Sequence, residues 1–439
     1  MEGKQKNLKQ LFIPICLEIL CQMLAGMADT LMLSSVGDKA VGAVGTANTY
    51  IGIFIIMFSI ISSGMIAVMT QYIGAKKDGV AYQARQLGLV FNGIIGVLLA
   101  VLLFFGAESI LNMVGIAPEL MSYAATYLKI VGGGCFINAL IPVFSSYLRA
   151  FGFTKQPLSA TVTANIANLV MNAVFIFGLD MGVAGAAAAT VLSRFLNLFM
   201  VMMASRRLIH IKDSFRLPRQ KVFGQIIKIG LPSAAETALY NVAMTLIIRL
   251  LNQMDDAGIN VTARSYAMQL ANFSYCVGAA LAQANAILTG WRTGSGKYEE
   301  CLRETRKAAL LGIITATVME TLIALSSGFL MQIFTDNAEI TALVSRLLFI
   351  DIVLEIGRTC NLVFGNALKT TGDAVFTTVI AVIFMYLFAV GGTYFFGIRL
   401  GLLVTGAYIG MAMDECIRAL CMFLRWQSGK WKEKRLVKS

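Results

Sequence analysis

The chain has 439 residues, of which 57% are hydrophobic and 14% are charged, with a formal net charge of +12. Its mean hydropathy is +0.74. Soluble domains carry about 25% charged residues, so this composition excludes an ordinary soluble protein and indicates a chain that crosses a membrane several times. The first apolar run, residues 11–33, is too long for the apolar core of a signal peptide and precedes no small-residue cleavage motif. We therefore expect it to be kept as the first membrane span.

In chain order the sequence holds twelve apolar segments, each long enough to cross about 30 Å of hydrocarbon as a helix. They lie near 11–33, 46–70, 87–107, 123–148, 158–179, 183–205, 226–253, 263–289, 308–331, 342–368, 374–397 and 400–425. The sequence predicts an all-α integral membrane protein with twelve transmembrane helices.

The connections between these segments alternate between basic and nearly uncharged. Lys76 and Lys77, the stretch 206–225 and the tail from Arg425 belong to the basic set. The opposite set contains only Lys39, Arg264, Arg346 and Arg399. Basic loops face the cytoplasm, so we expect a multi-pass protein of the cell (plasma or inner) membrane with both termini cytoplasmic. Because the positive charge is spread over short loops, it does not indicate a nucleic-acid partner.

The two halves of the chain resemble each other. Three pairs of positions recur about 220 residues apart, as an internal duplication would give: Pro14 with Pro232, the Arg149–Gly152 pair with Lys369–Gly372, and Gly185 with Gly406. Each half has six spans, so both insert the same way up. We expect two six-helix bundles related by a pseudo-two-fold axis along the membrane normal, with a cavity between them as in transporters.

The predicted division follows the longest basic connection. Residues 1–205 form the first six-helix bundle, residues 206–225 a cytoplasmic linker, and residues 226–439 the second six-helix bundle with a short basic tail.

The first span contains a proline, Pro14, and a carboxylate, Asp29. A charged group in a membrane helix costs roughly 2.5–3.5 kcal/mol, so Asp29 is expected to face protein or a water-filled cavity. From the helical rise of about 1.5 Å per residue, Asn168, Asn172 and Thr190 reach similar depths in their own spans. These oxygens could form an ion site, or an interhelical hydrogen-bonded seam, and spacing alone leaves both interpretations open.

Several short motifs carry a family resemblance. They are GMADTLML, whose Asp29 follows Pro14 by fifteen residues, TQYIGAKK, YLRAFGFTKQP, GVAGAAAAT, GLPSAAE, ALKTTGD and RALCMFLRWQSGKW. In this order and spacing they resemble the multidrug and toxic compound extrusion (MATE) transporters over essentially the whole chain.

That resemblance implies a cation-coupling site made of Asp29, Gln22, Asn168, Asn172 and Thr190. The coupling ion would be H+ on Asp29, or Na+ held by Asp29, Asn168, Asn172 and Thr190. Relatives carry an aspartate where this chain has Asn172, which weakens the case for sodium and slightly favours a proton.

The second half supplies further candidates. Glu236 lies one turn after Pro232 and has no partner nearby in the sequence, whereas Asp351, Glu355 and Arg358 share one helical face. The resemblance implies substrate or ion contact for acids in these spans. The alternative is that the acids and Arg358 neutralise each other as structural ion pairs.

We therefore predict a secondary active antiporter that exports lipophilic organic cations, such as drugs and dyes, in exchange for protons or sodium ions. Pro14 and Pro232 would be its hinges. It would need no cofactor, and its partners would be small organic cations and the lipid bilayer, with the protein acting as a monomer. The sequence shows no His, Cys or Ser constellation at membrane depth, with His210 the only histidine, so we expect no enzyme.

The alternative is a flippase for a lipid-linked precursor. Such a protein would need a cationic cavity for pyrophosphate. The membrane interior of the first half offers acids and, away from the outer Lys129, only Arg194, which favours cationic cargo.

Overall fold

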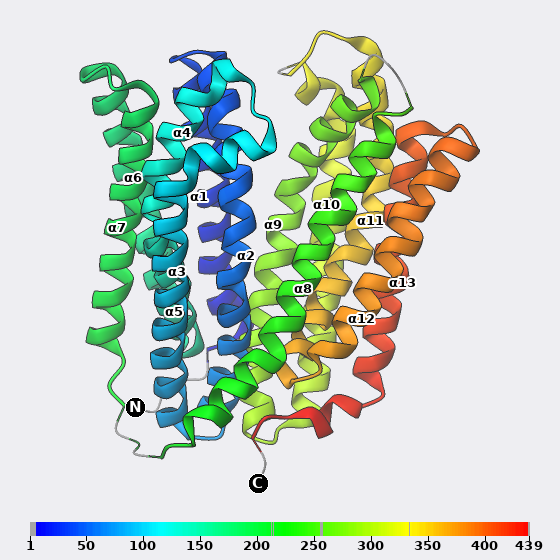
Figure 1. The fold of residues 1–439 in the computed structure, drawn as a ribbon. Helices are drawn as coiled ribbons and strands as arrows, with labels where there is room; N and C mark the ends of the chain where they lie inside the picture. Colours follow the sequence, from blue (N-terminus) through cyan, green and yellow to red (C-terminus); the bar gives the residue numbers. More distant parts are fainter. Residues whose placement is uncertain (1–5, 212, 214, 255–257, 333, 438–439) are drawn as a thin grey trace. The chain divides into compact units, whose positions relative to one another are not determined.

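The computed structural model describes residues 6–211, 213, 215–254, 258–332 and 334–437, and this part of the chain is helical with no strand. The first half consists of α1 (Leu8–Ser34), α2 (Asp38–Gly74), α3 (Asp78–Val114), α4 (Pro118–Gly133), α5 (Cys135–Ala150), α6 (Lys155–Asn172), the π-helical η1 (Ala173–Gly178) and α7 (Gly182–Leu208) (Figure 1).

The second half repeats this order. It consists of α8 (Arg219–Leu251), α9 (Ile259–Gly294), α10 (Tyr298–Met331), α11 (Ala338–Thr371), α12 (Ala374–Phe384), the π-helical η2 (Met385–Val390) and η3 (Thr393–Arg399), α13 (Leu403–Gln427) and the short 3₁₀ helix η4 (Lys430–Lys434). Each of the twelve predicted spans falls on a helix or on consecutive helices.

Within the described ranges, eight helices are long and apolar enough to cross a membrane, and the pair α4–α5, bent by 44°, makes a ninth. Helices α9, α11 and α13 do not meet this test. Each of them buries charged side chains, among them Arg264, Asp351 and Arg418. Buried charge in these helices lowers their hydropathy without moving them out of the bundle.

The chain divides into two compact units. One, here called the N-terminal unit, is Leu17–Leu231; the other, the C-terminal unit, is Pro232–Ser439 together with Met1–Cys16. Helix α1 therefore passes from one unit to the other just after Pro14, and α8 does so at Pro232. Relative to the predicted halves, the first sixteen residues are grouped with the opposite unit.

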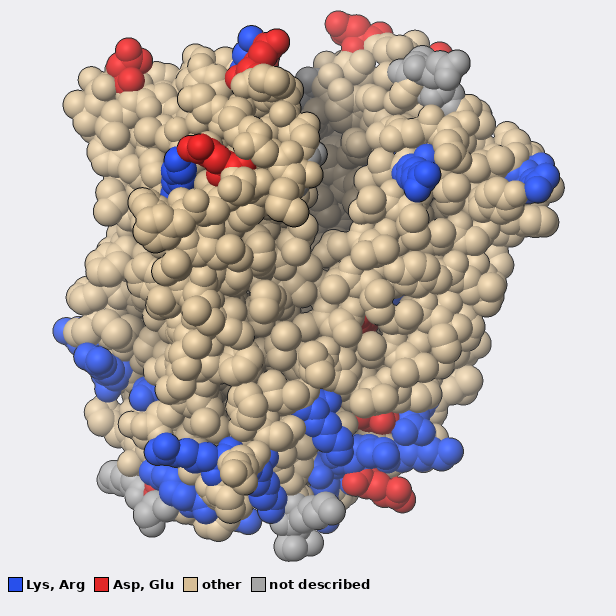
Figure 2. All heavy atoms as spheres, in the orientation of Figure 1, with Lys and Arg blue, Asp and Glu red and all other residues tan. Residues whose placement is uncertain are grey.

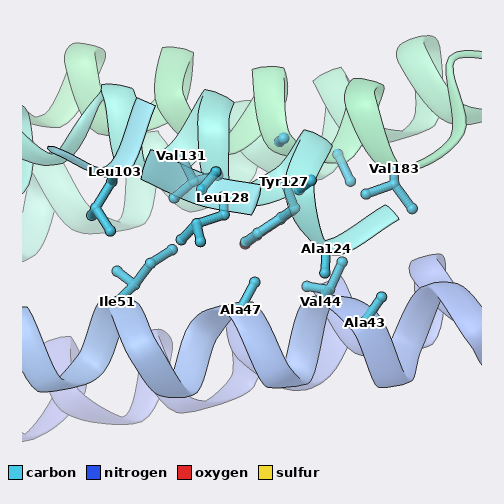
Figure 3. Close-up of a cluster of buried hydrophobic side chains, with 14 of the residues drawn as sticks. Ala43, Val44, Ala47, Ile51, Leu103, Ala124, Tyr127, Leu128, Val131 and Val183 are labelled. Atoms are coloured by element: carbon cyan, nitrogen blue, oxygen red, sulfur yellow. The ribbon is translucent and has the colours of Figure 1, made fainter. Parts of the chain in front are cut away.

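In the N-terminal unit, glycines allow the first part of α8 to pack directly on α2. A Cβ atom on Gly64 would lie 2.1 Å from the carbonyl oxygen of Ile226, and one on Gly230 would lie 1.7 Å from that of Ile60. No larger residue fits at either point without moving the backbone. The unit's apolar core lies between α2, α3, α4 and α7. Within it, Ala47 on α2 faces Leu128 on α4 (Figure 3).

In the C-terminal unit, the end of the chain is packed into the core. The rings of Trp426 and Trp431 stack with centroids 4.4 Å apart, and the indole N–H of Trp431 donates to the Trp426 carbonyl at 2.9 Å. Both rings are fully buried in a cluster that also receives Leu8 from the start of α1. This contact explains why the first residues belong to this unit.

The connection between α7 and α8 docks on the start of α3. The carboxylate of Asp213 accepts bonds from the backbone N–H groups of Gly79 and Phe215 at 3.1 and 2.9 Å. These bonds hold the pKa of Asp213 below its usual value. Its charge, and the attachment it provides, are lost only when the pH falls through that lowered pKa. The side-chain amide of Gln83 also exchanges two bonds of 3.0 Å with the backbone of Leu217.

Charge is segregated within each unit. Lys and Arg gather at the end that carries the α2–α3 and α9–α10 turns, whereas the middle of the visible face is nearly free of charge (Figure 2). A wide uncharged belt with basic residues at one end is the pattern of a membrane-spanning bundle.

The predicted repeat is visible in backbone and side chains. Gly152 and Gly372 follow α5 and α11 with positive φ angles of 82° and 107°. One turn after each proline stands a glutamate: Glu18 binds the Arg149 guanidinium at 2.8 Å and Glu236 binds the Lys369 ammonium at 2.9 Å. Equivalent ion pairs thus join the first and fourth spans of each half.

This geometry corrects the interpretation of Glu236. We expected no partner because none lies nearby in the sequence. The structure supplies Lys369 from α11, and the hydroxyl of Thr378 on α12 donates to the same carboxylate at 3.2 Å. Both partners lie more than 130 residues after Glu236 in the chain, and sequence spacing could not show that they meet it.

We predict that Glu18→Gln destabilises the protein strongly, by about 3–5 kcal/mol, because it removes the carboxylate that the Arg149 guanidinium binds at 2.8 Å, at a site where the Glu18 side chain is 4% exposed. Glu236→Gln should cost less, because the Glu236 side chain is 23% exposed. Thermal unfolding in detergent measures both.

The matched control is Glu108→Gln, which removes an exposed ion pair with Lys129 and should leave the unfolding temperature unchanged. The exchange Glu18→Arg with Arg149→Glu should recover part of the loss. Equal unfolding temperatures for Glu18→Gln and Glu108→Gln would show that the ion pair does not hold the helix.

Candidate functional site

The N-terminal unit contains a cavity of about 270 Å³. Six of its helices supply the lining: Gly26, Asp29, Thr30 and Leu33 from α1; Val44, Asn48, Ile51 and Ile55 from α2; Tyr127 and Val131 from α4; Asn138 from α5; Asn172 from α6; and Ala186, Thr190 and Arg194 from α7. Val44, Ile51 and Val131, with Tyr127, belong to the buried apolar cluster between α2 and α4 that borders the cavity (Figure 3). The lining therefore combines apolar residues with a set of polar groups.

Asp29 is held by a single amide. The side-chain N–H of Asn172 donates to Asp29 Oδ1 at 2.8 Å and also reaches Asn168 Oδ1 at 3.3 Å. Asn172 and Asn168 are both buried. Asn172 ends α6, and the wider π-helical turn of η1 follows it directly. Such π-helical turns are frequent at functional sites.

Thr190 lines the same cavity, and its hydroxyl donates to the Ala186 carbonyl one turn earlier at 2.9 Å. The structure therefore brings together Asp29, Asn168, Asn172 and Thr190. It does not bring Gln22 to them. Gln22 has an exposed side chain and is not part of the lining, because two helical turns separate it from Asp29 by about 10 Å along α1.

Sequence reasoning missed several lining groups. Tyr127 lies beside Asn48 and Thr190, and Asn138 faces Arg194. Polar residues inside apolar spans were a usable signal for Asn48 and Asn138. Tyr127 carried none, because a tyrosine in a span is ordinarily core or interface.

Arg194 places a positive charge in the cavity that contains Asp29. Its guanidinium donates to Asn138 Oδ1 at 3.2 Å, and its charge acts on Asp29 from a distance. Among the described residues these two side chains form no ion pair. The cavity thus holds two opposite charges that are each held by a neutral amide.

The described residues contain no group of three or more His, Cys, Asp or Glu side chains placed to hold a metal ion. At Asp29 the Asn172 amide presents its N–H group rather than its oxygen to the carboxylate, and the side-chain oxygens of Asn48, Tyr127 and Thr190 in the lining belong to neutral groups. A cation such as Na+ needs several converging oxygens.

The C-terminal unit has its own charged cluster, on α11 and α13. Arg358 pairs with Glu355 and lies 3.5 Å from Glu415, and Arg418 binds Asp414 and Glu415 at 2.7 and 2.9 Å. These contacts are those expected of structural ion pairs. Glu236 pairs with Lys369 and not with either arginine.

Carboxyl groups outnumber guanidinium groups in this cluster. Glu320, on α10, is fully buried, and within the described residues it forms no ion pair. Its carboxyl group shares a hydrogen bond with that of Asp351, and Glu355 also acts on it electrostatically. We missed Glu320, although a lone acid in an apolar span was the signal that identified Asp29.

A helical membrane protein built from two matching halves, with a polar cavity enclosed by its spans, has the architecture of a secondary transporter. The MatE family model matches residues 14–174 and 232–395. The chain belongs to this family.

Relatives extend over the whole chain. The uncharacterized transporter YisQ of Bacillus subtilis (strain 168) is 33% identical over 99% of this chain and 96% of its own. The probable multidrug resistance protein NorM of Thermotoga maritima is 28% identical over 99% and 94%. An outward-facing multidrug resistance MATE family transporter of the MOP superfamily matches with a TM-score of 0.87 at 22% identity, over 98% and 96%. The fold is the twelve-helix, two-bundle fold of these transporters.

We predict different stability effects for two acids of the C-terminal cluster. Glu320→Gln keeps the side-chain shape and removes no ion pair, so it should change the free energy of unfolding by about 1 kcal/mol or less. Glu355→Gln removes one carboxylate from Arg358 and should cost about 3 kcal/mol.

Thermal unfolding of both variants in detergent tests this. A larger loss for Glu320→Gln than for Glu355→Gln would mean that Glu320 is ionised and takes part in the pairing network.

Proposed function

We propose that this protein is a multidrug exporter, a secondary antiporter that moves small organic cations out of the cell in exchange for protons. The observation that carries the proposal is Asp29, a half-buried carboxylate that lines the cavity of the N-terminal unit, bonded by Asn172 and not neutralised by an ion pair among the described residues. The names of relatives such as the Thermotoga NorM protein support export of drugs. The protein would act as a monomer in the cell membrane, with both termini cytoplasmic.

The donor set at Asp29 supports a proton rather than sodium as the coupling ion. Asn172 supplies an N–H to the carboxylate, where a second acid would have supplied charge and oxygen. A proton needs only the one carboxylate.

Exchange would follow from competition for Asp29. The ionised carboxylate binds the cationic cargo, protonation removes the charge, and the cargo leaves. The two-state element would be the pair of proline-containing helices, since α1 and α8 pass from one compact unit to the other at Pro14 and Pro232. These prolines are the proposed hinges.

The C-terminal unit offers a second candidate for proton binding. Glu320 and Asp351 are buried and hydrogen-bonded to each other, with no ion pair to either among the described residues, and an ionised carboxylate without a cation is costly in such a site. Of the candidates in that half, Asp351 is the best supported. Glu355 and Arg358 pair with each other and Glu236 pairs with Lys369, so we assign these three to the framework.

The alternative, a flippase for a lipid-linked precursor, has less support. A pyrophosphate headgroup calls for several cations, and the cavity of the N-terminal unit offers Arg194 beside the acid Asp29. Export of a soluble dye by purified protein in vesicles would separate the two functions.

We expect Asp29→Asn to abolish proton-driven export of a fluorescent organic cation, because the amide can bind neither the proton nor the cargo charge. Dye efflux from cells at matched expression measures this. The control is Asp38→Asn, at the start of α2 and outside the cavity lining, which should export normally. Normal export by Asp29→Asn would show that Asp29 does not couple transport.

The identity of the coupling ion can be tested with purified protein in vesicles. We expect a pH gradient alone to drive uptake of the dye and a sodium gradient alone, at equal pH on both sides, to drive none. Asn172→Asp adds a second carboxylate beside Asp29 and should introduce sodium-driven transport. Sodium-driven transport by the unaltered protein would overturn the assignment of the proton.

A further inference from the structure

We propose that the cavity of the N-terminal unit selects amphoteric cargo, molecules that carry one cationic and one anionic group. Asp29 would bind the cationic group and Arg194 the anionic group. This inference rests on the proposed export function and names the cargo class of the same cavity.

The first support is that the two charges are kept apart. Asp29 on α1 is held by the Asn172 amide at 2.8 Å, and Arg194 on α7 donates to Asn138 at 3.2 Å. Both charged groups line the cavity, and within the described residues no ion pair joins either of them to another side chain. A neutral amide orients each charge without cancelling it, so both remain available to a ligand.

The second support is the contrast with the ion-paired charges at membrane depth. Glu18 and Glu236 each bind a cation directly, and Arg418 binds two acids. These charges serve the framework, whereas the buried Arg264 of α9 donates to the Met244 sulfur at 3.4 Å and is not part of this cavity's lining. An arginine that stays unpaired in a cavity is set up to receive an anionic group from outside, and its planar guanidinium matches a carboxylate.

The rest of the cavity suits a flat body between two charged ends. The apolar residues of the lining, among them Leu33, Ile55 and Val131, can contact a ring system, while Asn48 and Thr190 offer hydrogen bonds. A cargo that carries only a positive charge would also fit, but Arg194 would repel it. A second, anionic group on the cargo removes that penalty.

Proton coupling remains consistent with this cargo. With Asp29 ionised, the two cavity charges cancel and match a zwitterion. Protonation of Asp29 leaves Arg194 as the only charge, because a guanidinium does not give up its proton, so the cationic end of the cargo loses its contact. When one proton moves inward and one zwitterion moves outward, a net charge of plus one is transferred inward. When one proton moves inward and one monocation moves outward, no net charge is transferred.

The test uses two dyes that differ in one group: rhodamine 110, which carries a free carboxylate, and rhodamine 123, its methyl ester. In vesicles with an inward proton gradient, we expect the unaltered protein to transport rhodamine 110 with a KM about tenfold lower than rhodamine 123. Arg194→Gln should abolish this preference and retain transport of the ester. Arg194→Lys should keep a preference of a few-fold.

The matched control is Lys129→Gln, which removes a cation of α4 that pairs with Glu108 and is not part of the cavity lining. It should keep the tenfold preference. If Arg194→Gln does not fold, Asn138→Leu serves instead: it releases the Arg194 guanidinium and should raise the KM of rhodamine 110 alone by a few-fold.

The possible failures are distinguishable. If Asp29→Asn abolishes transport of both dyes while Arg194→Gln or Asn138→Leu leaves the KM ratio unchanged, the cargo class is wrong and the export function stands. If Asp29→Asn transports both dyes at the unaltered rate, the proposed function itself fails. A membrane potential that is negative inside should accelerate exchange of rhodamine 110 only, and equal acceleration of both dyes would also overturn the inference.

Discussion

The constraint on which this structure depends is the cost of charge inside a membrane-spanning bundle. The protein meets much of this cost by pairing: Glu18 with Arg149, Glu236 with Lys369, and the arginines of α11 and α13 with the acids around them. Buried Arg264 instead donates to the Met244 sulfur at 3.4 Å. The pairs Glu18–Arg149 and Glu236–Lys369 each join two different helices, whereas Arg418 and Asp414 lie on the same helix. Pairing thus keeps charged residues tolerable and also fixes which helices are neighbours.

Against that background the unpaired groups stand out. Asp29 and Arg194 line the cavity of the N-terminal unit without an ion pair among the described residues, and Glu320 is buried in the C-terminal unit beside another acid, Asp351. For the fully buried Glu320, an ionised carboxylate without a cation would carry a desolvation penalty that no ion pair offsets. Under the proposed function, an ion or a cargo would supply the missing partner of such groups.

The sequence predicted the spans, the repeat and the meeting of Asp29 with Asn168 and Asn172, because hydropathy, spacing and depth along a helix are local properties. It failed where contacts came from distant segments. Glu236 looked unpartnered because Lys369 lies 133 residues away, and no local pattern placed the start of α1 in the opposite unit. Gln22 lies on the same face of α1 as Asp29, but about 10 Å away from it along the helix axis.

The internal repeat explains why a flexible point and a fixed point occur together in both halves. A proline inside a helix removes one backbone hydrogen bond and clashes with the preceding turn, so the helix bends most easily there. In α1 and α8 the chain changes unit at that turn, and the ion pair of Glu18 or Glu236 follows within about one further turn, roughly 6 Å along the axis. Motion between the units would then be confined to a single turn, which leaves the cavity geometry around Asp29 intact as the helix bends.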